Sequence, residues 1–284
     1  MRCHWLAFLK ILPAWLQEPV DEFGKENLTE LRLRIGSAPE LVLTDQSIWL
    51  TREITGSDIT FCVNTASQYS PWTTATLQDG YLTALGGHRI GICGEVIRHQ
   101  DGQHCYQNVT SLCIRVARDF PDIAAGVPDN TGSVLIIGPP GSGKTTFLRD
   151  LIRQRSNHGQ GSVAVVDERG ELYPSVRGQR CFPVGKRTDI LSGMSKQRGI
   201  YSVIRTMGPA LIAVDEITDQ ADCDALVHAM WCGVTILASA HATCVQDLWK
   251  RSIYRPLVAS NIFDTLIVLQ QDKSWRMERI QYDG

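Results

Sequence analysis

The stretch GPPGSGKT, Gly138–Thr145, decides the fold of the domain that contains it. It matches the pattern GxxxxGK(S/T), with the apolar run Val134–Ile137 before it and a helical pattern over Thr145–Arg155 after it. Glycines let such a loop curl so that backbone N–H groups point at phosphate oxygens, and the following helix adds the positive end of its dipole. A glycine turn alone would not explain a lysine and a threonine at the helix start. The stretch therefore predicts a phosphate loop.

This loop predicts a site for ATP and Mg²⁺. Lys144 is expected to reach the β- and γ-phosphates, and Thr145 is expected to be a ligand of Mg²⁺. GTP is disfavoured because the sequence has no NKxD motif that would recognise guanine. The predicted nucleotide-binding residues are Gly138, Pro139, Pro140, Gly141, Ser142, Gly143, Lys144, Thr145 and Thr146.

Short apolar runs that end in polar residues follow the phosphate loop. They are Val163–Val166, Leu211–Val214 and Thr235–Ala238. Runs of this kind fit strands that helices cover on both faces, as in a parallel sheet. The second half of the chain is therefore predicted to be an α/β domain built on a parallel sheet.

Two of these runs are followed by an acidic pair, Asp167-Glu168 in one case and Asp215-Glu216 in the other. In P-loop proteins with an extra strand between the loop strand and the acidic strand, the later pair lies beside the loop. Asp215 is then expected to hold Mg²⁺ through water, and Glu216 to polarise the attacking water. The first pair would lie further out, near the γ-phosphate or a subunit edge.

A second assignment stays open, in which the first acidic pair does the chemistry. In P-loop kinases of small molecules, an acidic residue after the second strand is the base for the acceptor hydroxyl, and that residue would be Asp167. Such kinases usually carry an arginine-rich lid late in the chain, where this sequence offers Lys250, Arg251 and Arg255.

The run ILASAHAT, Ile236–Thr243, favours an ATPase over a kinase. A strand that ends in Ser239 and His241 would place a polar sensor beside the γ-phosphate. A single histidine at a strand end is more often structural. His241 gains weight because it follows a phosphate loop and an acidic strand in this order.

The chain before the phosphate loop is predicted to be a smaller α+β domain. Alternating polarity over Leu31–Ile35 predicts a strand, and Leu41–Leu43 is expected to begin its partner. Ser57 is a candidate N-cap of a helix. Gly86-Gly87 is expected to join two strands of a hairpin, and a further strand is predicted in SLCIRVAR, 111–118.

The domain boundary is expected in the run Asp119–Ser133, which is rich in Pro, Gly and Asp. The predicted domains are residues 1–125, the α+β domain, and residues 126–284, the P-loop domain.

Composition and charge exclude some classes of function. The chain is 43% hydrophobic with a net charge of −2, so broad binding to nucleic acid or to an anionic membrane is not expected. Helical spacing of Trp5, Phe8, Leu9, Leu12 and Leu16 predicts an amphipathic helix packed on its own domain, in preference to a membrane-surface or partner helix. Since no apolar segment reaches the ~20 residues of a membrane span, a cytoplasmic protein is expected.

Four runs together carry a family resemblance: GPPGSGKTTFLRDLIR, VVDERGELY, VIRTMGPALIAVDEITD and GVTILASAHA. They closely resemble the stage III sporulation protein AA family of endospore-forming bacteria. More distantly, they are similar to type II secretion and type IV pilus ATPases, which have a Walker A loop, an "Asp box", a Walker B strand and a "His box" in this order. The resemblance implies a RecA-like ATPase core. It places Glu168 and Glu171 in the Asp box, Asp215 and Glu216 in Walker B and His241 in the His box, and it implies that Glu168, Glu171, Glu216 and His241 are catalytic.

The resemblance extends to the first half of the chain. LRLRIGSAPELVL, GGHRIGICGEVIRH and LCIRVARDFP are similar to the PAS-like N-terminal domain of pilus ATPases, whose arginines reach nucleotide in the ring. The matching positions are Arg89, Arg115 and Arg118. The sequence departs from the secretion family in three ways. Asp215 stands where that family usually has glycine, Arg169 inside the Asp box has no clear counterpart there, and the tetracysteine zinc motif of many type II ATPases is absent.

By resemblance, the protein is expected to be a motor that hydrolyses ATP. The resemblance implies a homo-oligomer, expected to be a hexamer, and membrane-embedded partners in a channel between mother cell and forespore. It places the protein in the cytoplasm on the mother-cell side, at the membrane through its partners. A non-hydrolysing switch, in which ATP binding alone organises an assembly, is a further alternative.

Overall fold

The computed structural model describes residues 1–68, 80–98 and 104–280, and the chain divides into two compact units. The first unit comprises Met1–Asp119 and Pro174–Phe182, and the second comprises Phe120–Tyr173 and Pro183–Gly284. The expected boundary after residue 125 thus falls at Asp119. The expected second domain, 126–284, is also interrupted, because its segment 174–182 belongs to the first unit.

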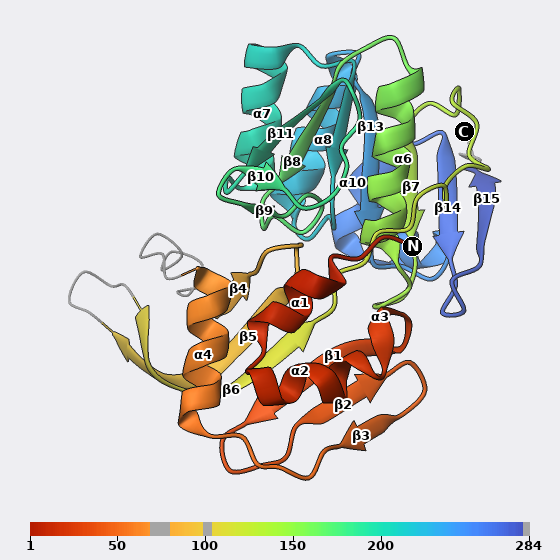
Figure 1. Ribbon diagram of the computed structural model, residues 1–284. Helices are drawn as coiled ribbons and strands as arrows, with labels where there is room; N and C mark the ends of the chain where they lie inside the picture. The colour runs from red at the N-terminus through yellow and green to blue at the C-terminus, as the bar shows by residue number, and fades with distance from the viewer. Residues whose placement is uncertain (69–79, 99–103, 281–284) are drawn as a thin grey trace. The chain divides into compact units, whose positions relative to one another are not determined.

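The first unit is built on a six-stranded antiparallel sheet in the order β3-β2-β1-β6-β5-β4 (Figure 1). Its strands are β1 (Leu28–Arg34), β2 (Glu40–Leu43), β3 (Ser47–Trp49), β4 (Tyr81–Thr83), β5 (Arg89–Arg98) and β6 (His104–Arg115). Its helices are α1 (Trp5–Ile11), α2 (Ala14–Asp21), α3 (Gly24–Asn27) and α4 (Gly56–Ser67). The strands predicted around Leu31, at Leu41–Leu43, on both sides of Gly86-Gly87 and within 111–118 are all present.

Buried and less buried side chains alternate along β1, so one face of the sheet forms the core and the opposite face does not. Leu31 and Leu33 are fully buried in a cluster that also contains Phe8 of α1 and Ile59 of α4. Helix α4 begins after Thr55 instead of the predicted cap Ser57. The Thr55 side chain accepts a hydrogen bond from the backbone N–H of Asp58, whose own carboxylate accepts from the N–H of Thr55, so a capping box selects the earlier residue.

The predicted N-terminal helix is two helices, α1 and α2, separated at Leu12-Pro13. Proline disfavours the helical conformation in the residue before it, and Leu12 is accordingly extended, with ψ 147°. Phe8, Leu12 and Leu16 are fully buried, so this segment does pack on its own domain. In the described part of the chain, no helix has the length and apolar character that a membrane crossing requires.

Segment 174–182 forms a small hairpin of β9 (Ser175–Val176) and β10 (Gln179–Arg180). Pro174, Cys181 and Phe182 at its base are buried and approach the turn residue Gly87 so closely that a Cβ there would lie 3.1–3.3 Å from all three. Gly87 also has φ +84°, which favours glycine. These contacts assign the segment to the first unit.

The second unit is built on a seven-stranded sheet in the order β11-β8-β12-β13-β7-β14-β15. The strands are β7 (Val134–Ile137), β8 (Val163–Asp167), β11 (Thr188–Ser192), β12 (Leu211–Val214), β13 (Thr235–Ala240), β14 (Thr265–Leu269) and β15 (Trp275–Arg279). The helices are α6 (Lys144–His158), α7 (Lys196–Met207), α8 (Gln220–Trp231), α9 (Val245–Lys250), η2 (Ser252–Tyr254) and α10 (Arg255–Ala259). The pair β14–β15 is antiparallel and the other neighbouring pairs are parallel.

Helices cover both faces of this sheet. One face packs against α7, α8 and α10 in a cluster that contains Val166, Val214 and Leu226, and α6 lies on the other face (Figure 1). Strand β13 lies between the phosphate-loop strand β7 and the acidic strand β12, so the expected extra strand is present. Because these strands are parallel, the segments after β7, β8, β12 and β13 meet at one edge of the sheet.

Candidate nucleotide site

The phosphate loop connects β7 to α6 at the carboxyl edge of the sheet. Gly141 and Gly143 have φ +74° and +96°, which a residue with a side chain rarely adopts, and Gly143 is the N-cap of α6. Lys144 is buried. Its Nζ donates to the carbonyls of Gly138 at 2.9 Å and Pro139 at 3.0 Å, and lies 3.0 Å from Nδ1 of His241.

Thr145 and Asp215, the two residues predicted to hold Mg²⁺, are in direct contact. Thr145 Oγ1 donates to Asp215 Oδ2 at 2.7 Å, and Ser239 Oγ donates to Asp215 Oδ1 at 2.5 Å. Burial raises the pKa of Asp215, while the hydroxyls of Ser239 and Thr145 act to lower it. A hydroxyl and a carboxylate are the hard oxygen donors that Mg²⁺ prefers, so this pair fits the ion.

Glu216 follows Asp215 in a constrained backbone conformation. Its φ is +43°, uncommon for a residue other than glycine, and its backbone N–H donates to Ser239 Oγ at 2.9 Å. Its Oε1 lies 2.9 Å from His241 Nε2. Since the Lys144 ammonium can only donate, His241 Nδ1 is the acceptor and Nε2 carries the proton toward Glu216. One imidazole therefore bridges the phosphate-loop lysine and the predicted catalytic glutamate.

The electrostatics of Lys144 agree with this convergence. Burial lowers the pKa of the Lys144 ammonium, and the carboxylates of Glu216 and Asp215 act in the opposite direction. The structure thus brings Lys144, Thr145, Asp215, Glu216 and His241 together at one edge of the sheet, although 97 positions separate the lysine from the histidine.

Asp167, the base in the kinase hypothesis, is a buried anchor for its own loop. Its carboxylate accepts backbone N–H groups from Glu171 at 2.9 Å, Leu172 at 3.2 Å and Tyr173 at 2.8 Å. Burial raises the pKa of Asp167, and these three donors act to lower it. Arg149 of α6 fixes the same loop by donating to the carbonyls of Leu172 and Glu171. Three of the roughly four acceptor positions of this carboxylate are therefore used by its own loop.

Glu168 and Glu171 line a narrow cavity of about 30 Å³ beside the two acidic pairs. Its lining is Val166, Asp167, Glu168, Arg169, Glu171, Lys196, Asp215, Glu216 and Thr218. Lys196 Nζ donates to Glu168 Oε2 at 2.9 Å. The structure therefore places both glutamates next to Asp215 and Glu216.

The three predicted arginines belong to the first unit, where two are neighbours. Arg89 and Arg115 are directly opposite on β5 and β6. Arg89 stacks over the Tyr81 ring at 4.1 Å, and Arg115 pairs with Glu30 at 3.2 Å.

Arg118 is engaged by its own backbone surroundings. It donates to the carbonyl of Lys25 at 2.7 Å and also to that of Leu28, where α3 passes into β1. Its half-buried guanidinium supports the fold of the first unit, which disfavours it as a residue that reaches nucleotide.

Two lysines of the second unit were missed by the motif analysis. Lys196 lies in the cavity described above, and Lys273, in the turn between β14 and β15, donates to the carbonyl of Gly141 in the phosphate loop. Neither lies in a recognisable motif. For Lys196 the signal would have been a lysine at the start of a helix between the two acidic segments.

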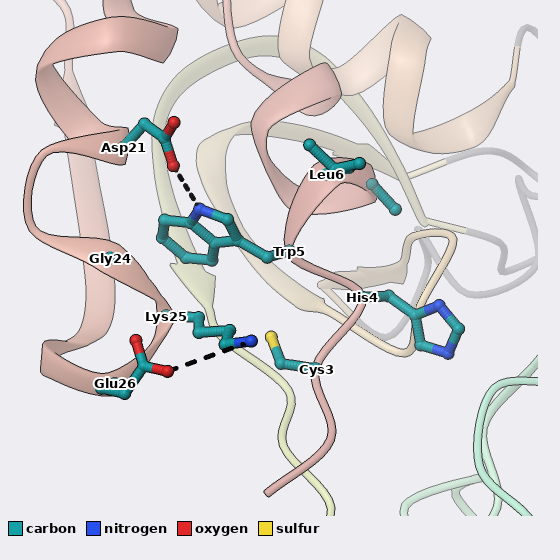
Figure 2. Close-up of a pocket in the computed structure, with 9 residues that line it drawn as sticks. Cys3, His4, Trp5, Leu6, Asp21, Gly24, Lys25 and Glu26 are labelled. Carbon is teal, nitrogen blue, oxygen red and sulfur yellow. Dashed lines mark hydrogen bonds and ion pairs between the residues drawn. The ribbon is translucent and has the colours of Figure 1, made fainter.

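A larger cavity lies in the first unit, between the N-terminal segment and the α2–α3 region (Figure 2). Its volume is about 590 Å³, and its walls include Cys3, Trp5, Asp21, Lys25 and Glu26. Trp5 Nε1 donates to Asp21 at 2.5 Å and Lys25 faces Glu26 at 3.9 Å, so these polar groups are paired with one another. None of the predicted site residues lines it.

Comparison with known proteins agrees with the geometry. Residues 9–283 match the family described as "Sporulation stage III, protein AA". The stage III sporulation protein AA of Bacillus subtilis (strain 168) is 34% identical over 277 residues, covering 93% of this chain and 90% of that protein.

Solved structures show the same fold. The ATPase DotB of Legionella pneumophila has a TM-score of 0.61 at 15% identity, covering 94% of this chain and 79% of that chain. The pilus retraction motor PilT, solved with bound ADP, also has a TM-score of 0.61 at 15% identity, covering 88% of this chain and 76% of that chain. The predicted fold class, a RecA-like α/β core preceded by a smaller sheet domain, is confirmed.

Proposed function

The chain belongs to the sporulation stage III protein AA family, and from that premise we propose that it is a Mg²⁺-dependent ATPase that drives a sporulation-associated channel complex. The observation that carries the proposal is the bridge from Lys144 through His241 to Glu216, next to the Thr145–Asp215 pair. It joins a group that binds phosphate to a group that activates water. The fold itself is ATPase-like.

Each residue has a distinct role in this proposal. The phosphate loop, Gly138–Thr146, holds the phosphates of ATP, with Lys144 on the β- and γ-phosphates. Thr145 and Asp215 hold Mg²⁺, which offsets phosphate charge when bound. Glu216 accepts the proton of the attacking water at Oε2, because its Oε1 accepts from His241 Nε2. Glu168 and Glu171 complete the acidic wall.

The oligomer and the partners rest on the family resemblance. We propose a hexamer in the cytoplasm on the mother-cell side that acts with membrane-embedded partners. In it, Arg89 and Arg115 would supply positive charge to the developing γ-phosphate charge. Arg89 and Arg115 are directly opposite each other on neighbouring strands, which supports treating them as a pair. The contacts of Arg118 with backbone carbonyls argue against including it.

The kinase alternative has less support. Asp167 would have to act as a base, yet its oxygens accept three backbone N–H groups. Breaking those bonds would release the loop that also carries Glu171. The switch alternative makes the same contacts as the ATPase and differs only in hydrolysis, so it needs an experiment.

That experiment compares the full chain with its Glu216→Gln variant. Phosphate release from Mg-ATP and binding of a non-hydrolysable analogue are measured for both, with Asp224→Asn as the matched control. Asp224 is an exposed carboxylate on α8 outside the site. The ATPase proposal expects hydrolysis that E216Q abolishes and D224N retains, with analogue binding unchanged in both.

Other outcomes select the alternatives. Binding without hydrolysis in the unchanged chain would establish the switch. Phosphate transferred to a small hydroxylated acceptor instead of water would establish the kinase. Mass photometry with and without the analogue tests the hexamer, and a monomer in both conditions would refute it.

A further inference from the structure

Lys196 is a buried ammonium between two acidic elements. Among the described residues, Lys144 and Lys196 are the lysines that are buried. Lys196 begins α7, and its Nζ lies 2.9 Å from Glu168 Oε2 and 3.5 Å from Asp222 Oδ2. Burial acts to lower the pKa of this ammonium, but the two carboxylates outweigh it and raise the pKa. Lys196 is therefore a fixed positive charge.

The two partners of Lys196 belong to different parts of the site. Glu168 directly follows β8 in the first acidic segment. Asp222, in the first turn of α8, accepts from the backbone N–H of Thr218 at 3.1 Å and from its hydroxyl at 3.2 Å. Thr218 closes the loop that follows Glu216. Lys196 thus links the first acidic segment to the loop of the second.

The positive charge of Lys196 lies next to a group of carboxylates. Five carboxylates line the cavity beside it, those of Asp167, Glu168, Glu171, Asp215 and Glu216. Like charges at this spacing repel one another, and partial burial strengthens the repulsion. Arg169 lines the same cavity, and Lys196 contacts Glu168 at 2.9 Å. The Glu168 side chain is 37% exposed, so the ion pair with Lys196 competes with water for this carboxylate.

We infer that Lys196 is a positioning residue for the ATPase, one that holds Glu168 against the nucleotide site and ties it, through Asp222, to the Glu216 loop. The inference rests on the proposed function. Lys196 does not touch the phosphate loop in any hydrogen bond or ion pair recorded for the described residues, so it acts through Glu168 and leaves nucleotide binding unaffected.

The test uses four variants of the full chain: K196M, K196R, E168Q and the double variant K196M/E168Q. Displacing a catalytic carboxylate by about 1 Å costs up to about a hundredfold, so K196M should lower kcat about 10- to 100-fold. KM for ATP and the Kd of a non-hydrolysable analogue should stay within about twofold. K196R should recover most of the activity, because it restores the charge. The matched control is K186M, which replaces an exposed lysine of the same unit and should retain full activity.

The double variant separates positioning from a general loss of stability. If Lys196 acts through Glu168, K196M/E168Q should be no slower than E168Q alone. Additive losses, or a kcat unchanged in K196M, would overturn the inference. A fall in analogue affinity that parallels the fall in kcat would also overturn it. If K196M does not fold, K196Q, which also removes the charge, takes its place in the single and the double variant.

A second readout does not depend on hydrolysis. Reductive methylation followed by mass spectrometry should find Lys196 protected in the unchanged chain and more reactive in E168Q, where Asp222 is its remaining partner, with Lys186 modified in both. Equal modification of Lys196 in the two proteins would refute the inference, whether or not the chain hydrolyses ATP. Protection without hydrolysis would instead refute the proposed function and leave the ion pair standing.

Discussion

His88 should make the first unit lose stability as the pH falls. Its ring is fully buried in the connection between β4 and β5, and burial lowers its pKa from 6.5 to about 4. Nδ1 accepts from the backbone N–H of Ala117 at 3.1 Å, so Nε2 carries the proton and donates to the carbonyl of His4 at 3.1 Å. Both ring nitrogens are used, and the folded protein has no place for a second proton.

The sign and size of the pH effect on the free energy of unfolding follow from the lowered pKa of His88. Between pH 6.5 and about 4 the unfolded chain binds the His88 proton and the folded chain does not, so stability rises with pH. The contribution is fully present above pH 6.5 and is lost as pH falls toward 4. At about 1.4 kcal/mol per pKa unit, the total is about 3 kcal/mol.

The assay is urea unfolding of the full chain between pH 7.5 and 4.5, with 5-fluorotryptophan as the probe. The ¹⁹F signals of Trp5 and Trp15 report on the first unit; Trp5 stacks on Phe8, which in turn lies against His88. His88→Gln keeps a donor and an acceptor but cannot be protonated, so its pH dependence should be flatter. His4→Gln is the matched control, because it keeps the backbone carbonyl that accepts from His88. The His4 side chain also acts to lower the pKa of His88, but burial is the larger cause, so most of the pH dependence should remain in this variant. Equal slopes in the unchanged chain and H88Q would refute the reasoning.

Three further changes test the structure elsewhere. Asp167→Asn should destabilise the second unit by about 3 kcal/mol, since it weakens three charge-assisted hydrogen bonds, and the ¹⁹F signal of Trp275 should report an earlier urea midpoint; an unchanged midpoint would contradict the anchoring role. Thr55→Ala removes the capping box of α4 and should cost about 1 kcal/mol in urea unfolding, whereas a neutral result would show that the cap contributes nothing. Lys144→Ala should abolish measurable binding of a fluorescent ATP analogue in equilibrium titration, and retained affinity would remove the phosphate loop from the proposed mechanism.

Local sequence signals predicted which helices and strands exist better than they predicted where each one ends or which other segments it packs against. The phosphate loop and the strands around it were predicted because each is defined by residues adjacent in the chain. Two features were missed, the first although its signal is local and the second for want of such a signal. Pro13 breaks the N-terminal apolar pattern without disturbing its spacing, and segment 174–182 joins the first unit through contacts with Gly87, far away in sequence.

The candidate site shows the same limit at the level of single groups. Lys144, Thr145, Asp215 and His241 were predicted to meet because a parallel sheet brings the ends of its strands to one edge. Lys196 was not predicted, because its importance comes only from the carboxylates that α7 brings near it. A lysine at the start of a helix is ordinary until its partners are known.

The two acidic pairs look alike in sequence, and the residues after them decide their different roles. After Asp167-Glu168 comes Arg169-Gly170, and Gly170 has φ +65°, with its N–H bonded to the carbonyl of Asp167 at 3.2 Å. The chain therefore turns back at once and delivers three N–H groups to the Asp167 carboxylate.

No glycine follows the second pair, where the residues are Ile217 and Thr218. The positive φ falls on Glu216 itself, held there by Ser239, and no returning loop covers Asp215 with backbone donors. Apart from the N–H of Glu216, the recorded donors to Asp215 are the hydroxyls of Thr145 and Ser239, from the phosphate loop and the neighbouring strand. A single glycine thus turns one acidic pair into an anchor for its own loop, and its absence leaves the other pair facing the phosphate loop.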